Sequence, residues 1–245
     1  RSSLDVEISL MGRRWLLKKY DERTALTIAQ RFGLNELIGR ILVSRGVRLE
    51  EVEHFLNPSL RNQLPDPGHL KDMVIAAERL STAVMNKEKI AVFGDYDVDG
   101  ATSSALLTRF FAEIGVEINV VIPDRIVDGY GPNTSALMDL HKEGTAIVVT
   151  VDCGTTSFEP IKEATNAGLD VIVVDHHEAE PNLPKAVAVV NPNRLDENSP
   201  HGNLAAVGVT FLLVVAINRS LREANFYANR YEPDLIQWLD LVALG

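Results

Sequence analysis

The sequence has few of the features that mark a secreted, membrane-bound or disulfide-rich protein. Its 245 residues contain a single cysteine, Cys153, which excludes a disulfide within the chain and a cysteine-rich zinc site. No stretch approaches the roughly 20 apolar residues of a membrane-spanning helix, and residues 1–15 contain no apolar core of a signal peptide. We therefore expect a reducing, cytoplasmic location and no membrane partner.

Two common phosphate-binding motifs are absent as well. Neither GxxxxGK[ST] nor GxGxxG follows the first strand-like segment, so the sequence offers neither a P-loop nor a dinucleotide fingerprint. A nucleophilic Cys153 is the other conceivable reactive group. Nothing in the spacing around it favours that role over a small buried thiol.

Positive charge is scarce over most of the chain. The 24 Lys and Arg face 34 Asp and Glu, a net charge of −10, which argues at first against nucleic acid as a partner. The imbalance is uneven, because residues 1–50 hold 10 Lys and Arg and 6 Asp and Glu, whereas the remainder holds 14 and 28. A cation-recruiting acidic site would explain part of this excess, and an ordinary acidic surface would explain it equally well.

From residue 88 onward, apolar strands alternate with helices. The strands are continuous Val/Ile runs, which is typical of strands buried on both faces. Their alternation with helices predicts an α/β fold with a doubly wound, mostly parallel sheet. Strands are predicted over 89–95, 117–124, 145–154, 169–177 and 186–193, and helices over 101–115, 133–144, 157–168, 204–221 and 232–245.

Residues 1–87 have a different pattern. Helical periodicity predicts one or two helices over 21–47 and another over 69–87, with a proline-rich loop over 55–69 between them. We therefore expect two parts: a helical N-terminal extension, 1–87, packed against a sheet domain, 88–245.

Three aspartates stand at alternate positions in "FGDYDVDGATSS", residues 93–104. Asp95, Asp97 and Asp99 follow the first predicted strand, where like charges this close repel one another. A single aspartate at a strand end is as often the N-cap of the next helix as it is a functional residue. Three of them in one turn indicate instead that a cation offsets the repulsion.

The ends of the other predicted strands carry similar residues. Because ligands of open parallel sheets bind outside the carboxyl ends of the strands, these residues are expected to meet at one edge. Four strand ends with carboxylates and imidazoles are hard to explain by helix capping alone. The residues are Asp124 and Arg125 after the second strand, Asp152 after the third, and Asp175, His176 and His177 after the fourth.

This set predicts a metal centre. Asp97 and Asp99, two apart in extended chain, point to the same side, Asp152 could bridge two cations, and His176 adds a nitrogen ligand. A mixed Asp/His set suits Mn²⁺ better than Mg²⁺ alone, which prefers oxygen ligands. We expect two divalent ions, Mn²⁺ or Mg²⁺, about 3.5–4 Å apart, in a site that hydrolyses phosphoesters.

The motifs "GDYDVDGATS", "VDCG" and "VDHH" resemble those of the DHH phosphoesterase superfamily, named after the triplet that Asp175, His176 and His177 form here. Within it, "PDRIVDGYGPN", "VVNPNR", "LAAVGVTF" and "LDLVALG" resemble a family of bacterial exonucleases that degrade single-stranded DNA from its 5′ end. The resemblance covers about residues 38–245.

The resemblance implies a role for each matching residue. His177 would contact the scissile phosphate, and Asp95 would support the first metal, because Phe93 stands where pyrophosphatase-like relatives have a ligand histidine. Arg125 would meet DNA phosphate, although a surface salt bridge with Asp124 or Asp128 explains it equally well. The implied metal ligands are Asp97, Asp99, Asp152 and His176, with Asp99 or Asp152 bridging, and Asp240 in the last motif.

The resemblance also implies an activity: metal-dependent 5′→3′ hydrolysis of single-stranded DNA to mononucleotides in DNA repair and recombination, in the bacterial cytoplasm. Its expected partners are single-stranded DNA, a single-strand-binding protein and a helicase. The alternative is a phosphoesterase of short oligoribonucleotides, phosphoadenosine phosphate or cyclic dinucleotides; a non-catalytic scaffold would have lost the ligands that are present here. Members of the family continue into a second lobe and an OB-fold domain, so we expect this chain to be part of a longer protein.

Overall fold

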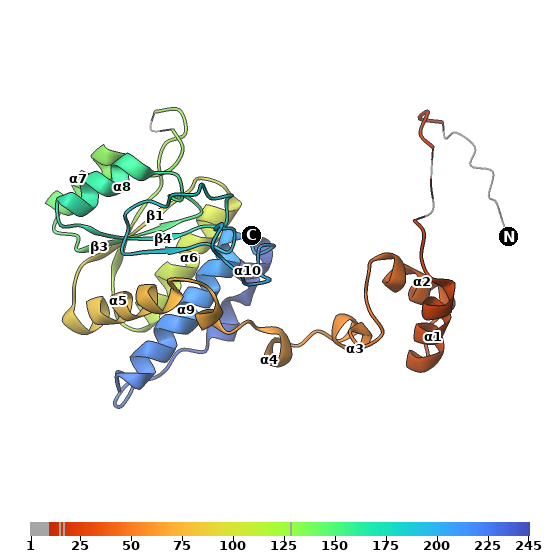
Figure 1. Ribbon diagram of the computed structural model, residues 1–245. Helices are drawn as coiled ribbons and strands as arrows, with labels where there is room; N and C mark the ends of the chain where they lie inside the picture. The colour runs from red at the N-terminus through yellow and green to blue at the C-terminus, as the bar shows by residue number, and fades with distance from the viewer. Residues whose placement is uncertain (1–9, 15, 17, 128) are drawn as a thin grey trace. The chain divides into compact units, whose positions relative to one another are not determined.

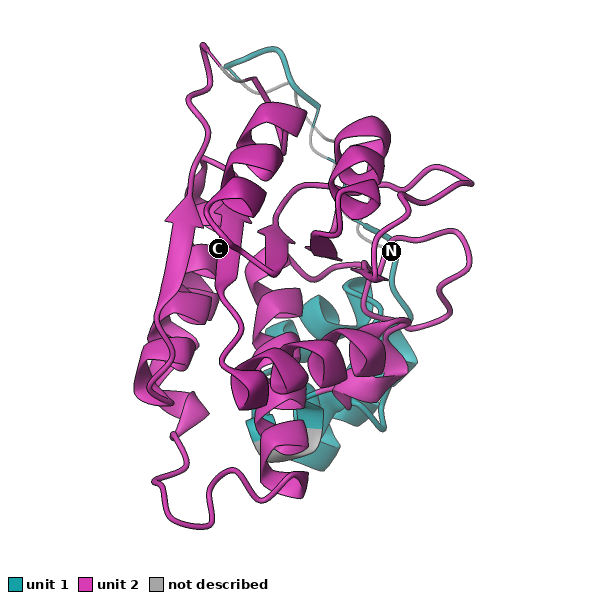
Figure 2. Ribbon diagram, turned by 90° about the vertical axis from the view of Figure 1, so that its left-hand side faces the viewer, with its two compact units in different colours: residues 1–64 teal, residues 65–245 magenta. Residues whose placement is uncertain are grey.

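The computed structural model describes residues 10–14, 16, 18–127 and 129–245. The chain forms two compact units, Arg1–Leu64 and Pro65–Gly245 (Figure 2). Within the described ranges, none of the helices is long and apolar enough to cross a membrane.

The smaller unit is helical, as the periodicity of residues 21–47 predicts. That stretch forms two helices, because Gly33 ends the first in a left-handed conformation (φ +63°) and the Asn35 side chain caps the second by accepting the Leu37 N–H. The predicted loop over 55–69 contains short helical turns as well. The helices are α1 Glu22–Phe32, α2 Glu36–Ser44, α3 Val52–Leu56 and α4 Leu60–Gln63.

The larger unit is built on a five-stranded parallel sheet, which confirms the predicted fold class. Its order is β2-β1-β3-β4-β5, so the direction of strand addition reverses between β1 and β3. In open sheets, ligands bind at the carboxyl ends of the strands beside such a reversal. The strands are β1 Ile90–Gly94, β2 Ile118–Val121, β3 Ile147–Val151, β4 Asp170–Val174 and β5 Ala188–Val190.

Helices cover both faces of this sheet (Figure 1). Alternate residues of β1 serve the two layers: Ala91 and Phe93 pack in one hydrophobic cluster, and Ile90 and Val92 in the other. The strands are buried on both faces for this reason, as their continuous apolar runs predict. The first cluster lies under α7 Thr134–Lys142 and α8 Phe158–Asn166, and the second under α5 Met73–Asn86, α6 Val98–Glu113 and α9 Ala206–Glu223.

The two compact units divide at residues 64 and 65 rather than at the expected boundary of 87 and 88. The predicted helix over 69–87 exists as α5, but it packs against α9 and β5 of the larger unit. Its Met73, Ala76 and Leu80 are buried in the core of that unit. The apolar face of α5 therefore ties it to the sheet, even though β1 begins only at residue 90.

The single helix predicted over 232–245 is wrong in detail. A 3₁₀ turn, η2 Leu235–Trp238, precedes a short helix, α10 Leu239–Leu244. Trp238 is buried and its ring meets that of Phe110 on α6 edge-on, with 6.4 Å between the ring centroids. This large buried side chain lies where the 3₁₀ turn ends and α10 begins, at the break in the predicted helix.

Candidate metal centre

The turn after β1 is shaped by a helix cap. The Asp97 carboxylate caps α6 by accepting the N–H groups of Asp99 and Gly100, at 3.0 and 3.1 Å. A side chain at Gly100 would place its Cβ 2.3 Å from the Asp95 carbonyl oxygen, so only glycine allows the chain to turn this tightly. Capping and clustering are therefore not alternatives here, because the same cap brings Asp95 and Asp97 to the sheet edge.

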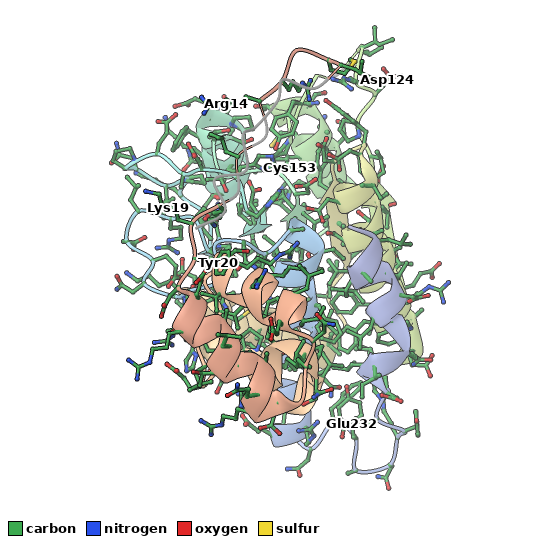
Figure 3. The ribbon with its side chains drawn as sticks, turned by 90° about the vertical axis from the view of Figure 1, so that its right-hand side faces the viewer. Arg14, Lys19, Tyr20, Asp124, Cys153 and Glu232 are labelled. Atoms are coloured by element: carbon green, nitrogen blue, oxygen red, sulfur yellow. The ribbon has the colours of Figure 1, made fainter. Side chains whose placement is uncertain are left out.

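Asp152 directly follows β3 and is held in an unusual conformation. Its backbone is left-handed, with φ +60°, which costs free energy in a non-glycine residue and often marks functional sites. The Tyr130 hydroxyl donates to the Asp152 carbonyl at 3.1 Å. The side chain is buried, and its Oδ1 accepts no hydrogen bond. The next residue, Cys153, is a buried thiol inside the larger unit (Figure 3).

The triplet after β4 is organised by its aspartate. Asp175 accepts the backbone N–H groups of His176 and His177 at 2.7 and 3.2 Å, and its Oδ1 lies 2.7 Å from Nδ1 of the His177 ring. Its other oxygen accepts the N–H of Thr155 at 3.1 Å. Asp175 thus fixes the orientation of His177 and leaves the far side of that ring available.

Residues that follow β1, β3 and β4 lie close together. One ligand atom from each of Asp95, Asp97 and Asp152 lies within 4.8 Å of the others, and Asp152, His176 and His177 form a second such group. His176 Nε2 is 3.4 Å from Asp152 Oδ1. Asp152 belongs to both groups, which is the place a bridging ligand would take, and the two groups meet beside the strand-order reversal between β1 and β3.

Asp99 makes helix-capping bonds that the sequence did not reveal. Its two carboxylate oxygens accept the N–H groups of Ala206 and Val207 at the start of α9, at 2.6 and 2.7 Å. One of these oxygens also lies 3.6 Å from His176 Nε2. The carboxylate therefore joins the N-termini of two helices to the edge of the candidate centre.

Burial and neighbouring charges perturb the carboxylates of the cluster. Burial, together with the carboxylates of Asp99 and Asp97, raises the pKa of Asp152 to about 8. Burial also raises the pKa of Asp95. The pKa of Asp97 is lowered, because burial is outweighed by hydrogen bonds from Gly100 and Asp152. A protonated Asp152 thus shares its proton with Asp97.

The histidine pair adds positive charge next to these carboxylates. The hydrogen bond with Asp175, opposed by burial, raises the pKa of His177 to about 9. The pKa of Asp175 falls to about 2, because bonds from His177 and Thr155 outweigh its burial. His177 is consequently an imidazolium at neutral pH, and it places a positive charge beside the carboxylate group.

The donor set fits divalent cations. Oδ1 of Asp95 and Oδ1 of Asp152 are both buried without a hydrogen-bond partner, although buried polar atoms are ordinarily paired. Oxygen donors with one imidazole nitrogen suit Mn²⁺, and also Mg²⁺ with water.

Besides Asp99, two predicted site residues belong to neither of these groups. Asp240 is exposed, and its Oδ1 accepts the N–H of Leu241 at 2.8 Å; its role as a ligand stays a prediction. The Arg125 guanidinium lies over the Tyr96 ring, 5.1 Å from the centroid. Asp128, one proposed partner of Arg125, lies outside the described residues. The other, Asp124, accepts the N–H groups of Ile126 and Val127 on the loop after β2 (Figure 3).

Sequence reasoning assigned no role to several residues that shape this centre. Tyr130 stands in "PDRIVDGYGPN" and Asn191 and Asn193 in "VVNPNR", so the motifs were visible. Their partners were not, because each contacts a residue of a different strand end: Tyr130 touches Asp152 and His177, whereas the two asparagines bond to the histidine pair.

Known proteins share this sequence and fold. Residues 89–245 match the DHH family, N-terminal domain. The single-stranded-DNA-specific exonuclease RecJ of Bacillus subtilis is 33% identical over 232 residues, covering 95% of this chain and 28% of that protein. RecJ of Escherichia coli K12 is 39% identical over 216 residues, covering 86% and 37%. The chain thus spans about a third of the length of these relatives.

A solved structure agrees with the sequence matches. RecJ of Thermus thermophilus in complex with Mn²⁺ superimposes with a TM-score of 0.72 at 28% identity, covering 93% of this chain and 30% of that one. A second structure, an exonuclease RecJ bound to manganese, matches with a TM-score of 0.60 at 33% identity, covering 71% and 42%.

Proposed function

The chain belongs to the DHH family, and from that membership we propose that it is the metal-dependent core of an exonuclease that hydrolyses single-stranded DNA from the 5′ end to mononucleotides. The observation that carries the proposal is the pair of ligand groups that share Asp152 at the sheet edge. Relatives named single-stranded-DNA-specific exonuclease RecJ support the choice of substrate.

Five residues would hold two divalent ions: Asp97, Asp99, Asp152, His176 and Asp240. Bound there, the ions would supply an activated water and stabilise charge on the phosphoryl group. Asp95 lies beside Asp97 with one buried oxygen unpaired, which suits a residue that supports the first ion. The contacts to the substrate phosphates would be made by His177 and Arg125.

His177 would contact the scissile phosphate. Asp175 bonds to its Nδ1, so the proton on Nε2 is free to be donated to a phosphate oxygen. The ring is about half exposed and positively charged at neutral pH, and a charged donor strengthens such a bond. Tyr130, 3.3 Å from the same ring, limits its movement.

Arg125 would meet the phosphate backbone next to the centre. Its guanidinium is exposed and stacks on Tyr96, in the turn that carries the acidic cluster. Its positive charge also acts to lower the pKa of Asp95, so it lies within electrostatic reach of the carboxylates. Stacking pre-orients the planar group for bonding to phosphate.

The setting of the activity is proposed from the resemblance: DNA repair and recombination in the bacterial cytoplasm, with a single-strand-binding protein and a helicase as partners. The two relatives named above are bacterial proteins. Co-purification of tagged chain with either protein from a bacterial lysate, with and without nuclease treatment, would test these partners separately from the activity.

The activity is tested with labelled oligonucleotides. In Mn²⁺, we expect a single-stranded 20-mer to release mononucleotides from its 5′ end, and a blunt duplex to stay intact. Asp152→Asn should abolish release, whereas Asp139→Asn, an exposed carboxylate paired with Lys142 on α7, should not. Cleavage confined to dinucleotides or cyclic dinucleotides would contradict the proposal and favour a small-substrate phosphoesterase.

A further inference from the structure

The segment after β5, Asn191-Pro192-Asn193, grips the backbone of the histidine pair. Asn191 donates from its amide to the carbonyl of His177 at 2.9 Å, and Asn193 donates to the carbonyl of His176. Two amide side chains from one tripeptide thus hold two consecutive peptide units of a different strand end.

Hydrogen-bond chemistry fixes the orientation of both amides. Asn191 uses its second N–H for Thr155 Oγ1, at 2.9 Å, and its oxygen accepts the N–H of Asn193 at 2.8 Å. The second N–H of Asn193 lies 3.3 Å from the carbonyl of Gly202. Since carbonyl oxygens only accept, the nitrogen of each amide must face the histidine backbone, and a carboxylate could not replace it.

The tripeptide is itself anchored. Pro192 restricts the backbone between the two asparagines, and the next residue, Arg194, donates to the Val189 carbonyl and to the Asp72 carboxylate, both at 2.6 Å. Asp72 also accepts the N–H of Val189 at 3.1 Å. The tripeptide is thereby tied to the start of α5 and to β5, so it can hold the histidines without moving with them.

We propose that Asn191 and Asn193 are positioning residues that aim His176 at the metal ion and His177 at the phosphate. The inference rests on the proposed function, because it takes His176 as a metal ligand. Outer hydrogen-bond partners of metal ligands typically change metal affinity about 10–100-fold when they are removed. Here the partner acts on the backbone of the ligand rather than on its ring.

Asn193→Asp is the sharpest test, because it keeps the shape and removes the donor. In titrations with Mn²⁺ or Mg²⁺ alone, we expect a roughly 10-fold or greater loss of Mn²⁺ affinity and a smaller change for Mg²⁺, which depends less on a nitrogen ligand. If Asn193 were a bystander, the added negative charge would strengthen or leave unchanged the binding of a cation. That result would overturn the proposal.

Matched variants separate charge and folding from positioning. Asn182→Asp makes the same change at an exposed asparagine of the connection between β4 and β5 and should leave the preference for Mn²⁺ over Mg²⁺ unchanged. Gly202→Ala would bring a Cβ to 2.7 Å from Asn193 Oδ1 and should lower that preference without adding charge. Because Gly202→Ala displaces the Asn193 amide without changing Asn193 itself, it tests the positioning role even if Asn193→Asp fails to fold.

His176→Gln distinguishes this inference from the proposed function. If that variant binds Mn²⁺ as tightly as the unaltered chain, the proposed metal site is wrong. If it weakens Mn²⁺ binding while Asn193→Asp and Gly202→Ala do not, the site stands and the positioning role is overturned. Weakening in all three variants is the expected result.

Discussion

At the scale of single residues, Asp152 carries the largest electrostatic cost in the protein's candidate centre. Its pKa in the metal-free protein is about 8, far above the ordinary value of about 3.9. A carboxyl group whose pKa is raised by folding destabilises the folded state once the pH exceeds the unfolded pKa, and it does so increasingly until the pH reaches the folded one. Asp152 therefore lowers the stability of the metal-free chain above the pKa of the unfolded aspartate.

We predict that Asp152→Asn removes nuclease activity and raises the stability of the metal-free chain. Asparagine suits this site better than alanine, because it tolerates the left-handed backbone. The gain in unfolding free energy should be about 1–3 kcal/mol at pH 8, given about 1.4 kcal/mol per pKa unit and partial loss of the bond to Asp97, and it should shrink toward pH 4.

Urea unfolding in chelator at pH 8 and pH 5 measures this difference. Asp139→Asn is the control, since exposed ion pairs contribute little. A mutant that unfolds more easily than the unaltered chain at pH 8 would show that Asp152 is a structural residue instead.

The same raised pKa predicts a pH dependence of metal binding. Below about pH 8 the metal-free site holds a proton on Asp152, which an ion must displace. Apparent Mn²⁺ affinity should therefore rise between pH 6 and pH 8, by up to about tenfold per unit for one displaced proton. His177, with a pKa of about 9, stays protonated through this range. Calorimetry in two buffers of different ionisation enthalpy counts the protons released, and a flat affinity would contradict the prediction.

At the scale of elements, Asp99 and Asp152 differ in the groups they bond to, although the sequence predicts both as metal ligands. The side chain of Asp152 bonds to the neighbouring carboxylate of Asp97, inside the cluster, whereas Asp99 caps α9 through two backbone N–H groups. Repulsion within the cluster acts on both, but only Asp99 also holds a helix outside the cluster. Opposite stability effects should follow.

We predict that Asp99→Asn destabilises the metal-free chain by about 1–2 kcal/mol, the usual cost of a lost helix cap. An amide can accept only one of the two N–H groups and presents its own donor to the other. The measurement is urea unfolding in chelator beside Asp152→Asn. Equal or greater stability for Asp99→Asn would mean that relief of repulsion outweighs the cap.

Glycine in the turn after β1 gives a second prediction at this scale. Gly100→Ala should cost about 1–3 kcal/mol of unfolding free energy, because its Cβ would press on rigid backbone 2.3 Å away. Gly208→Ala in α9 is the matched control: its Cβ meets only the Leu204 side chain, 3.3 Å away, and helix propensity favours alanine. Similar thermal midpoints for the two variants would show that the turn is not tightly packed.

At the scale of the whole molecule, charge limits what this chain can do with DNA. Residues 65–245 hold 13 Lys and Arg against 26 Asp and Glu, a net of −13. Phosphate contacts supply most of the affinity for nucleic acid, and at the candidate centre Arg125 and the His177 imidazolium are the two cations we propose for them. The larger unit by itself is thus poorly equipped to hold a strand.

We predict that the chain binds single-stranded DNA weakly and cleaves it slowly compared with a longer relative such as B. subtilis RecJ, of which it spans 28%. Few phosphate contacts predict a shallow salt dependence, about −0.7 in log K per log salt for each contact. Titrations of a labelled 20-mer at 50–200 mM salt in Mn²⁺ measure both. Equal affinity and rate for the two proteins would refute this account of the charge.

Much of the fold and of the site was predictable from sequence, because local patterns report burial and chain reversal. Continuous Val/Ile runs identified strands buried on both faces, and their alternation with helices determined a parallel sheet. That sheet places every strand end at one edge, so Asp95, Asp97, Asp152 and the histidine pair had to converge. Apolar periodicity also located α5, although not the unit in which it packs.

Tertiary packing decided the contacts that no local pattern encodes. The bonds of Asp99 to the start of α9, of Tyr130 to Asp152 and of Asn193 to His176 join residues that lie on different connections. Their partners depend on the paths of loops and on how close two elements approach, and the break before α10 similarly goes with the burial of Trp238 against α6. Sequence determined which groups gather at the sheet edge, and packing decided which hydrogen-bond partners they have there, because apolar character belongs to a single residue whereas a hydrogen bond requires two.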